Sequence, residues 1–472
     1  MLIFRPSLQR PPKSRSSRTI RQPTSNPVPP RNPYRAILRR DYPEPFIALL
    51  VFILGIWLWD HYFGRPQGYP PGTEEVALVK IDRDLRLAET MGADPPWLRW
   101  LAGADDPAHA RENARIALES LIRERAIGLR GLEAFAVLKA DQTGRPAREM
   151  LVEMMQGESV MDFGETARRL GSHRGTWWEA RLVEEWEKSA RPEVTWQQAH
   201  GADSRQIRTR AILARGVVWL IALAGLAFVP HTLRELRAGF SRRPRGYGDA
   251  WPLPLGLVVF LVSTLAWIGF TMTLELGIGA LPGLHPVLGI LLDSAARLLP
   301  ALIALGLLFR RPSHAVRVLG LDKPAATRAI LGMFTLLMIL DQVLRAAFGA
   351  GADTEPGGGL SAGEAGLWGL AFGVVSACLL APVSEEILYR GVLFRALRNR
   401  LGLAVAAVFS SAVFAVLHFY NGYGLASVGV FGCACALIYA SRTALWSCIL
   451  LHVLYNSSIK IPEWIIYHAA LG

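Results

Sequence analysis

Cysteine is scarce in this chain, and its placement excludes two kinds of site. The 472 residues include 4 cysteines, all in apolar segments: Cys378, Cys433, Cys435 and Cys448. None lies in a polar stretch, where a disulfide framework or a paired-cysteine zinc motif would be expected. The H-E-x-x-H helix motif of metalloproteases is also absent. The sequence therefore predicts neither a disulfide-rich fold nor a standard zinc centre.

Charge is also sparse, at 19% of residues, whereas 51% are hydrophobic and 14 are tryptophan. This composition indicates a polytopic membrane protein with a soluble part. The net charge of +12 comes largely from arginine-rich segments beside apolar runs. Positive charge at such places marks cytoplasmic loops, so we predict the lipid bilayer as a partner and no nucleic acid.

The N-terminal half contains three kinds of segment. Residues 1–44 are rich in Arg, Pro and Ser, which predicts a disordered cytoplasmic tail. Residues 45–63 contain an apolar run with an aromatic flank, which predicts a transmembrane signal anchor. A cleaved signal peptide is the less favoured alternative, because no A-x-A-like cleavage site follows the apolar run. Residues 65–208 mix apolar positions at helical spacing with Arg and Glu, which predicts a soluble, mainly helical domain.

Apolar runs long enough to cross a membrane recur in the rest of the chain. They lie at 211–230, 252–273, 284–308, 329–347, 366–382, 403–420, 425–440 and 444–459. Together with the anchor, these runs predict an all-α bundle of about nine membrane spans. The transmembrane helices of residues 211–347 come first, and the spans of residues 365–460, which carry the candidate site, follow them. Arginine-rich connections alternate with short or acidic ones, which predicts a cytoplasmic N-terminus, an extracytoplasmic 65–208 domain and a bacterial-type inner membrane.

Two Asp–Arg pairs lie inside the predicted spans. Asp293 and Arg297 are four residues apart, and so are Asp341 and Arg345. Each pair can neutralise itself along one helix face, so a structural role is favoured over a catalytic one.

The stretch Ser384–Gly391 places two adjacent carboxylates at the end of an apolar run. Glu386 and Arg390 are four residues apart, so on a helix they can form an ion pair. Glu385 points about 100° away, and that arginine leaves it unpaired. Taken alone, the stretch is typical of a solvated helix end, whereas a buried carboxylate would indicate a functional site.

Candidate partners for Glu385 lie in two later spans. His418 follows Phe414 by four residues, and His452 lies one turn before Asn456. If the chain turns near Leu401–Gly402, Glu385 lies about 16 to 17 residues before the turn and His418 about 16 to 17 residues after it. At a constant helical rise per residue, the two side chains then lie at the same depth in the membrane. With further turns near Tyr423 and Ser441–Arg442, the same count of residues along the helices places His452 within about 4.5 Å of the depth of His418. The three motifs are thus predicted to share one layer.

A desolvated glutamate beside a histidine can hold and deprotonate a water molecule. His452 and Asn456 could then donate hydrogen bonds to the oxyanion of a tetrahedral intermediate, so the pattern predicts amide hydrolysis. Zinc bound by Glu385, His418 and His452 is the alternative. It is not favoured, because the only further carboxylate, Glu386, is expected to be occupied by Arg390. Candidate nucleophiles without a convincing base are Ser384, Ser410, Ser411 and Ser457.

These motifs resemble, in their order, those of the CPBP family (CAAX protease and bacteriocin-processing, or Abi) over roughly 365–460. The resemblance implies an intramembrane endopeptidase in which Glu385 and His418 activate water, while His452 and Asn456 bind the oxyanion. It also implies that Glu386, Arg390 and Phe414 support the site. The activity would be similar to that of CAAX prenyl proteases, but their substrate does not carry over, and we predict membrane-associated proteins or peptides as substrates. The alternatives are a non-catalytic scaffold or bacteriocin-immunity protein of the same fold and, without evidence of inverted repeats, a proton-relay transporter.

Overall fold

The computed structural model describes Ile47, Tyr247 and residues 49–55, 73–123, 127–154, 176–190, 197–242, 251–279, 286–348, 366–418 and 422–467. Regular structure in these residues is entirely helical. All of them belong to the second of two compact units, Tyr42–Gly472. The predicted tail at 1–44 lies outside the described residues, and the predicted anchor at 45–63 is described only in part, where 49–55 is helical.

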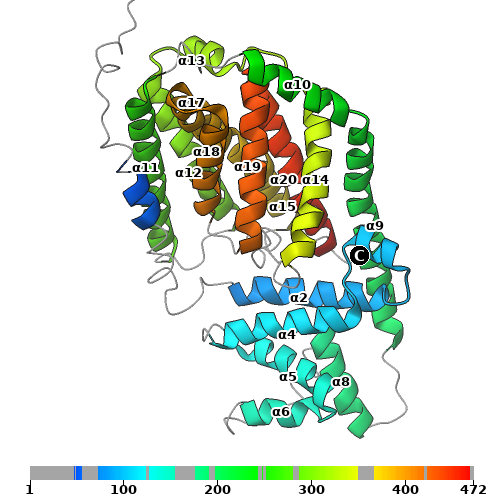
Figure 1. Cartoon of the computed structure of the whole chain (residues 1–472). Coiled ribbons are helices and arrows are strands. Elements are labelled where there is room, and N and C mark those ends of the chain that lie inside the picture. The colour runs from blue at the N-terminus through cyan, green and yellow to red at the C-terminus, as the bar shows by residue number, and fades with distance from the viewer. Residues whose placement is uncertain are drawn as a thin grey trace, which may run out of the picture. The chain divides into compact units, whose positions relative to one another are not determined.

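Short amphipathic helices form one side of the unit (Figure 1). They are α2 (Thr73–Thr90), α3 (Pro96–Ala102), α4 (Pro107–Arg123), α5 (Leu129–Thr143), α6 (Ala147–Met154) and α8 (Trp177–Ala190). Their inward residues, among them Leu85, Leu118 and Trp178, form a core of their own. We call α2 to α8 the N-terminal helical layer; it occupies the stretch predicted at 65–208.

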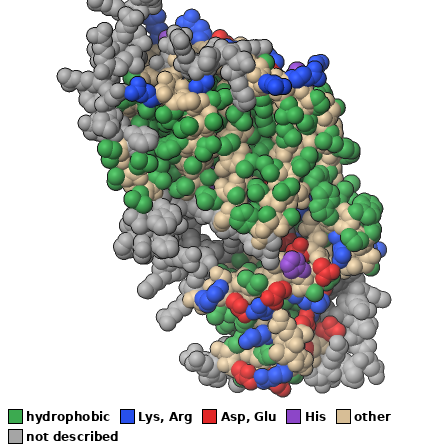
Figure 2. All heavy atoms as spheres, in the orientation of Figure 1, with side chains coloured by type: hydrophobic (Ala, Val, Ile, Leu, Met, Phe, Trp, Pro, Cys, Tyr) green, Lys and Arg blue, Asp and Glu red, His purple; other side chains and the backbone are tan. Residues whose placement is uncertain are grey.

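The remaining helices form an all-α membrane bundle, as predicted. In chain order they are α9 (Gln197–Leu226), α10 (Val229–Arg242), α11 (Leu253–Gly279), α12 (Pro286–Leu308), α13 (Pro312–Leu319), α14 (Thr327–Phe348), α15 (Gly366–Val375), α16 (Ala381–Glu385), α17 (Arg395–Arg400), α18 (Leu403–Val416), α19 (Gly422–Arg442) and α20 (Leu445–Tyr467). On the face shown in Figure 2, hydrophobic side chains cover the bundle between two charged ends. The chain is therefore an integral membrane protein.

The number of spans differs from the prediction. Within the described residues, 6 helical stretches are long and apolar enough to cross a membrane: 205–226, 253–274, 288–308, 327–348, 367–400 and 422–442. The nine predicted spans are not confirmed. Helix α18 has only 14 residues, because the helix ends at Val416. The polar residues of α20, His452 and Asn456 among them, lower its average hydropathy.

The predicted span 366–382 is too short, because the helical path continues to Arg400. It runs through two π-helical stretches, η4 (Ser376–Leu380) and η5 (Glu386–Phe394), which flank α16. The break at Leu401–Gly402 lies where it was predicted, and α18 starts at Leu403. The next turn falls between Val416 and Gly422, earlier than the predicted turn near Tyr423.

Polar contacts attach the N-terminal helical layer to the bundle. Arg208 on α9 donates two hydrogen bonds to Asp94, at 2.7 and 2.8 Å. Arg83 on α2 donates to the carbonyl of Ile466 on α20, at 2.9 Å. The layer is therefore held against α9 and against α20, the helix that carries His452 and Asn456.

The Asp94–Arg208 contact predicts a pH-dependent contribution to stability. The hydrogen bond from Arg208 lowers the pKa of Asp94 below its ordinary value of 3.8. A carboxyl with a depressed pKa in the folded state stabilises above its unfolded pKa and loses that contribution as the pH falls. We expect wild type to melt above Asp94→Asn at pH 6 and this difference to shrink towards zero at pH 3, measured by thermal unfolding in detergent. Arg208→Gln should reproduce the pattern, and a difference that persists undiminished in acid would contradict it.

Candidate active site

Three predicted side chains meet in the middle of the bundle. Glu385 is the last residue of α16, and its Oε2 atom is buried without a hydrogen-bond partner among the described residues. Oε2 lies 4.0 Å from His418 Nε2 and 3.8 Å from His452 Nε2. These separations are too long for direct hydrogen bonds, but they suit a small group placed between the three atoms.

The orientation of His418 follows from its other ring nitrogen. His418 lies just beyond the end of α18, in the turn that begins at Leu417, whereas the sequence placed it inside a span. Its Nδ1 is 2.7 Å from the carbonyl oxygen of Phe414. A carbonyl can only accept, so Nδ1 carries the proton, and in the neutral ring Nε2 presents a lone pair towards Glu385.

His452 is oriented by the second glutamate. Its Nδ1 lies 2.8 Å from Glu386 Oε1, and the same oxygen accepts a hydrogen bond of 2.8 Å from Arg390 Nη1. The side chains of Glu386 and Arg390 are 0% and 1% exposed. Sequence reasoning predicted the Glu386–Arg390 pair but not the contact with His452, because only the relative rotation of η5 and α20 brings them together.

Aromatic and backbone contacts hold this arrangement. Arg390 Nη2 donates to the Gly432 carbonyl at 3.2 Å, and its guanidinium lies 4.5 Å from the centroid of the Phe414 ring. The Phe414 ring centroid lies 4.5 Å from that of His418 and 6.1 Å from that of His452. Phe414 thus contacts the groups that orient the site as well as the histidines themselves.

The site opens into a cavity of about 210 Å³. Glu385 and His418 line it together with Thr264 and Trp267 of α11 and Arg297 of α12. The walls from α11 and α12 lie outside the part of the chain that carries the sequence motifs, so the motifs alone did not predict them. Their residues carry no local motif, and long-range packing alone brings them to Glu385.

The pair Asp293–Arg297, interpreted from sequence as structural, stands beside this cavity. Arg297 Nε donates to Asp293 Oδ2 at 2.6 Å, and Ser376 donates to the same oxygen at 3.3 Å. The pair thus connects α12 to η4 while its arginine faces the cavity that contains Glu385.

Comparison with protein families gives a match to this part of the chain. Residues 367–458 match the family model described as type II CAAX prenyl endopeptidase Rce1-like. We call residues 367–458 the Rce1-like segment, after the family model that they match. The match confirms the predicted resemblance to CAAX proteases of the CPBP type, and the sequence motifs from Glu385 to Asn456 all lie inside it. No curated protein and no solved structure matches the chain.

Asn456 has a backbone partner in the Rce1-like segment. The π-helical register of η4 pairs the amide of Ala381 with the carbonyl of Ser376. The next residue, Pro382, has no N–H, so the carbonyl of Ala377 lacks its helical donor. Asn456 Nδ2 donates to that carbonyl at 3.0 Å. One amide N–H of Asn456 thus joins α20 to η4, and its role in binding an oxyanion stays a prediction.

The zinc alternative can be compared with the positions of these atoms. Zinc ligands lie about 2.0 to 2.2 Å from the ion, so ligand atoms on a tetrahedral ion are roughly 3.4 Å apart. The separations from Glu385 Oε2 are 4.0 and 3.8 Å, and no group of three His, Cys, Asp or Glu residues in the described ranges is arranged to hold a metal. A zinc ion would need the two histidine nitrogens about 0.4 to 0.6 Å closer to Glu385 Oε2 than they lie.

Proposed function

We propose that the Rce1-like segment is an intramembrane endopeptidase that hydrolyses peptide bonds of membrane-associated proteins or peptides. The supporting observation is the position of Glu385 Oε2, a buried acceptor facing the Nε2 atoms of His418 and His452. Glu385 Oε2 and His418 Nε2 can both accept a hydrogen bond and cannot satisfy each other, whereas a water molecule between them can donate one proton to each.

In the proposed reaction, Glu385 removes a proton from this water while His418 Nε2 holds the water in position. The resulting hydroxide attacks the carbonyl carbon of the scissile peptide, and the carbonyl oxygen becomes an oxyanion. The proton then passes from Glu385 to the leaving nitrogen as the C–N bond breaks, which gives a carboxylic acid and an amine and restores the Glu385 carboxylate. This uses one residue as base and then as acid.

We propose His452 and Asn456 as the groups that stabilise the oxyanion. With both ring nitrogens protonated, His452 would donate from Nε2 to the oxyanion, and its Nδ1–H would stay on the Glu386 carboxylate. Glu386 in turn is held by Arg390. Asn456 still has a second amide N–H, because only one bonds to Ala377.

The test is cleavage by the full-length protein in proteoliposomes. The substrates are a prenylated peptide that ends in a CAAX-type sequence and the same peptide without the prenyl group, with fragments identified by mass spectrometry. Cleavage of the prenylated peptide by wild type supports the proposal and a CAAX-like substrate preference. If no member of a wider set of membrane-associated peptides is cleaved, a non-catalytic scaffold of the same fold replaces it.

A chelator should leave this cleavage unchanged. A zinc ion held by Glu385, His418 and His452 would need a further carboxylate as base. Glu386 already bonds to Arg390 and His452, so it does not suit that role. The measurement compares initial rates before and after dialysis against a strong chelator. Loss of activity that added zinc restores would replace the glutamate mechanism with a metal-dependent one.

For topology, we propose that the end of the bundle with α10, α13 and α17 faces the cytoplasm. These helices lie together at the end opposite α2 and α4 (Figure 1), and they carry or adjoin the arginine-rich connections. The N-terminal helical layer would then be extracytoplasmic in a bacterial-type inner membrane, with the N-terminus inside. Labelling of the layer from the cytoplasmic side would contradict this orientation.

A further inference from the structure

Ser384 carries a buried hydroxyl that the proposed hydrolysis does not use. It precedes Glu385 in α16 and lines the same cavity of about 210 Å³. Ser384 is 1% exposed, and its Oγ atom has no hydrogen-bond partner among the described residues. A buried hydroxyl without a partner costs free energy in the folded protein, so its place in the cavity indicates that a bound molecule supplies the partner.

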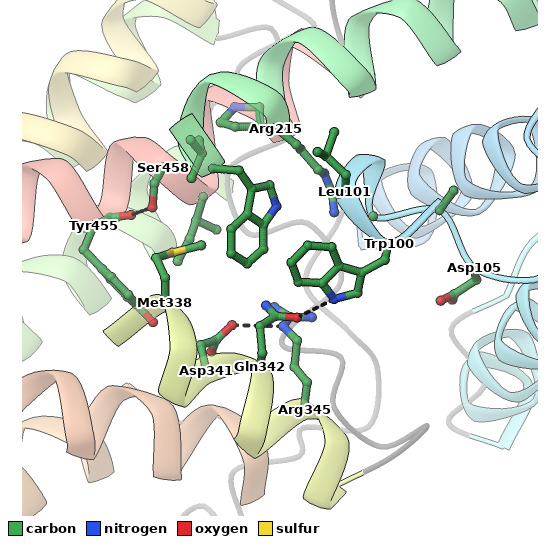
Figure 3. A pocket seen from close by; sticks show the side chains of 16 residues that line it. Trp100, Leu101, Asp105, Arg215, Met338, Asp341, Gln342, Arg345, Tyr455 and Ser458 are labelled. Atoms are coloured by element: carbon green, nitrogen blue, oxygen red, sulfur yellow. Dashed lines mark hydrogen bonds and ion pairs between the residues drawn. The ribbon is translucent and has the colours of Figure 1, made fainter. Parts of the chain in front are cut away.

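Helical serine and threonine side chains commonly donate to the carbonyl oxygen three or four residues earlier. Thr264, which also lines the Glu385 cavity, donates in this way to the carbonyl of Phe260 at 2.8 Å. Ser458 lines a second cavity, of about 330 Å³, beside the N-terminal helical layer, and donates to the carbonyl of Tyr455 at 2.7 Å (Figure 3). Within the described ranges Ser384 makes no such bond, so its hydroxyl can donate to a ligand.

Three other buried hydroxyls also lack a partner in the part of the chain that the structure describes. They belong to Ser263, Thr271 and Ser411. None of these three residues lines the cavity that contains Glu385. Of the four hydroxyls, that of Ser384 alone combines a missing partner with a place beside the proposed base.

The other walls of the cavity indicate which kind of molecule would bind there. Trp267, Pro300, Leu388 and Leu417 surround it with apolar groups. A peptide that enters from the bilayer brings main-chain N–H and C=O groups, which need partners where no water replaces them. The Ser384 hydroxyl can supply one such partner next to the site of hydrolysis.

We propose that Ser384 binds the substrate by donating a hydrogen bond to a main-chain carbonyl oxygen beside the scissile peptide. Rotation about χ1 alone redirects a serine hydroxyl, so Oγ can turn towards the substrate while the helix stays in place. Every residue of a peptide carries such a carbonyl, so the contact selects an accessible main chain and no particular side chain. The inference rests on the proposed function, and the water activated by Glu385 remains the nucleophile.

Peptide binding to full-length Glu385→Gln tests this role without cleavage. The probe is the prenylated CAAX-type peptide with a fluorophore, and its anisotropy is measured against nanodiscs, with empty nanodiscs as the blank. In this background Ser384→Ala should weaken binding about two- to tenfold, as expected for the loss of one neutral hydrogen bond. Ser384→Cys keeps the shape but donates weakly, so it should resemble Ser384→Ala. Ser263→Ala removes a buried hydroxyl away from the cavity and is the matched control, with an unchanged Kd.

Thermal unfolding distinguishes substrate binding from packing. Ser384→Ala and Ser263→Ala each remove a buried hydroxyl that has no partner among the described residues. Both variants should therefore melt at or above the temperature of the parent protein. A clearly lower melting temperature for Ser384→Ala would mean that the hydroxyl stabilises the fold, and it would overturn the proposal.

The remaining outcomes separate this inference from the proposed function. Unchanged peptide binding by Ser384→Ala would remove the residue from the site, and cleavage by wild type would then stand without it. Binding that depends on Ser384, without cleavage by wild type, would support the inference and leave a peptide-binding scaffold in place of the enzyme. If no membrane-associated peptide binds to Glu385→Gln, the inference fails. A peptide acyl group trapped on Ser384 Oγ would make this residue the nucleophile and replace both proposals.

Discussion

Glu385→Gln is expected to lower the kcat of peptide cleavage by at least about 10³-fold, because the amide cannot take a proton from water. The change preserves the size of the side chain, so folding should be unaffected. His418→Gln should have an effect of similar size, since both groups act on the same water. The double variant should be little worse than either single one, as is usual for residues that act as a unit.

Glu463→Gln is the matched control for this series. Glu463 lies on α20 as His452 does, but it is paired with Lys460 and lies about three turns from the histidine. Its replacement should leave kcat unchanged. Cleavage that survives in Glu385→Gln at near wild-type rate would remove Glu385 from the reaction, and an equal loss in the control would indicate a general effect on the fold.

The second large effect is expected on stability, from the buried pair Glu386–Arg390. Arg390→Met would leave the Glu386 carboxylate, which is 0% exposed, without its guanidinium partner, while the contact with His452 Nδ1 remains. Removing one member of a buried ion pair typically costs about 3 to 5 kcal/mol, since an uncompensated charge stays inside. We therefore expect a large drop in the free energy of unfolding, measured by denaturant titration in mixed micelles.

The double change Glu386→Gln with Arg390→Met distinguishes pairing from simple packing. It removes both charges, so it should be less destabilised than the sum of the single changes, with a coupling of about 1 to 3 kcal/mol. Arg390→Lys keeps the charge but loses the geometry that reaches both Glu386 and the Gly432 carbonyl, so an intermediate stability is expected. Strict additivity of the two single changes would contradict this role of the pair.

Much of the candidate site could be predicted because distance along a helix can be counted. The break at Leu401–Gly402 fixed the heights of Glu385 and His418, and the structure places their side chains 4.0 Å apart. The spacing of Glu386 and Arg390 likewise predicted a contact within one helix. Both results depend on the rise per residue, which is nearly constant.

Rotation about each helix axis could not be counted in the same way. The contact of His452 with Glu386 depends on how α20 faces η5, and η5 itself is π-helical, which changes the residues that share a face. The bond from Asn456 to Ala377 likewise arises only because η4 and Pro382 leave a carbonyl free. The difference between the nine predicted spans and the six candidate spans in the described residues has a related origin, because a hydropathy pattern does not show where α18 ends.

By itself, then, the sequence determined that this is an α-helical membrane protein with three motifs at one depth, since apolar run length and helical rise are local properties. Only the tertiary structure decided that α11 and α12 wall the Glu385 cavity and that Glu386 orients His452. It also placed the guanidinium of Arg215 beside Gly103. These features join segments distant in the chain, and packing between helices, which no local pattern encodes, brings them together.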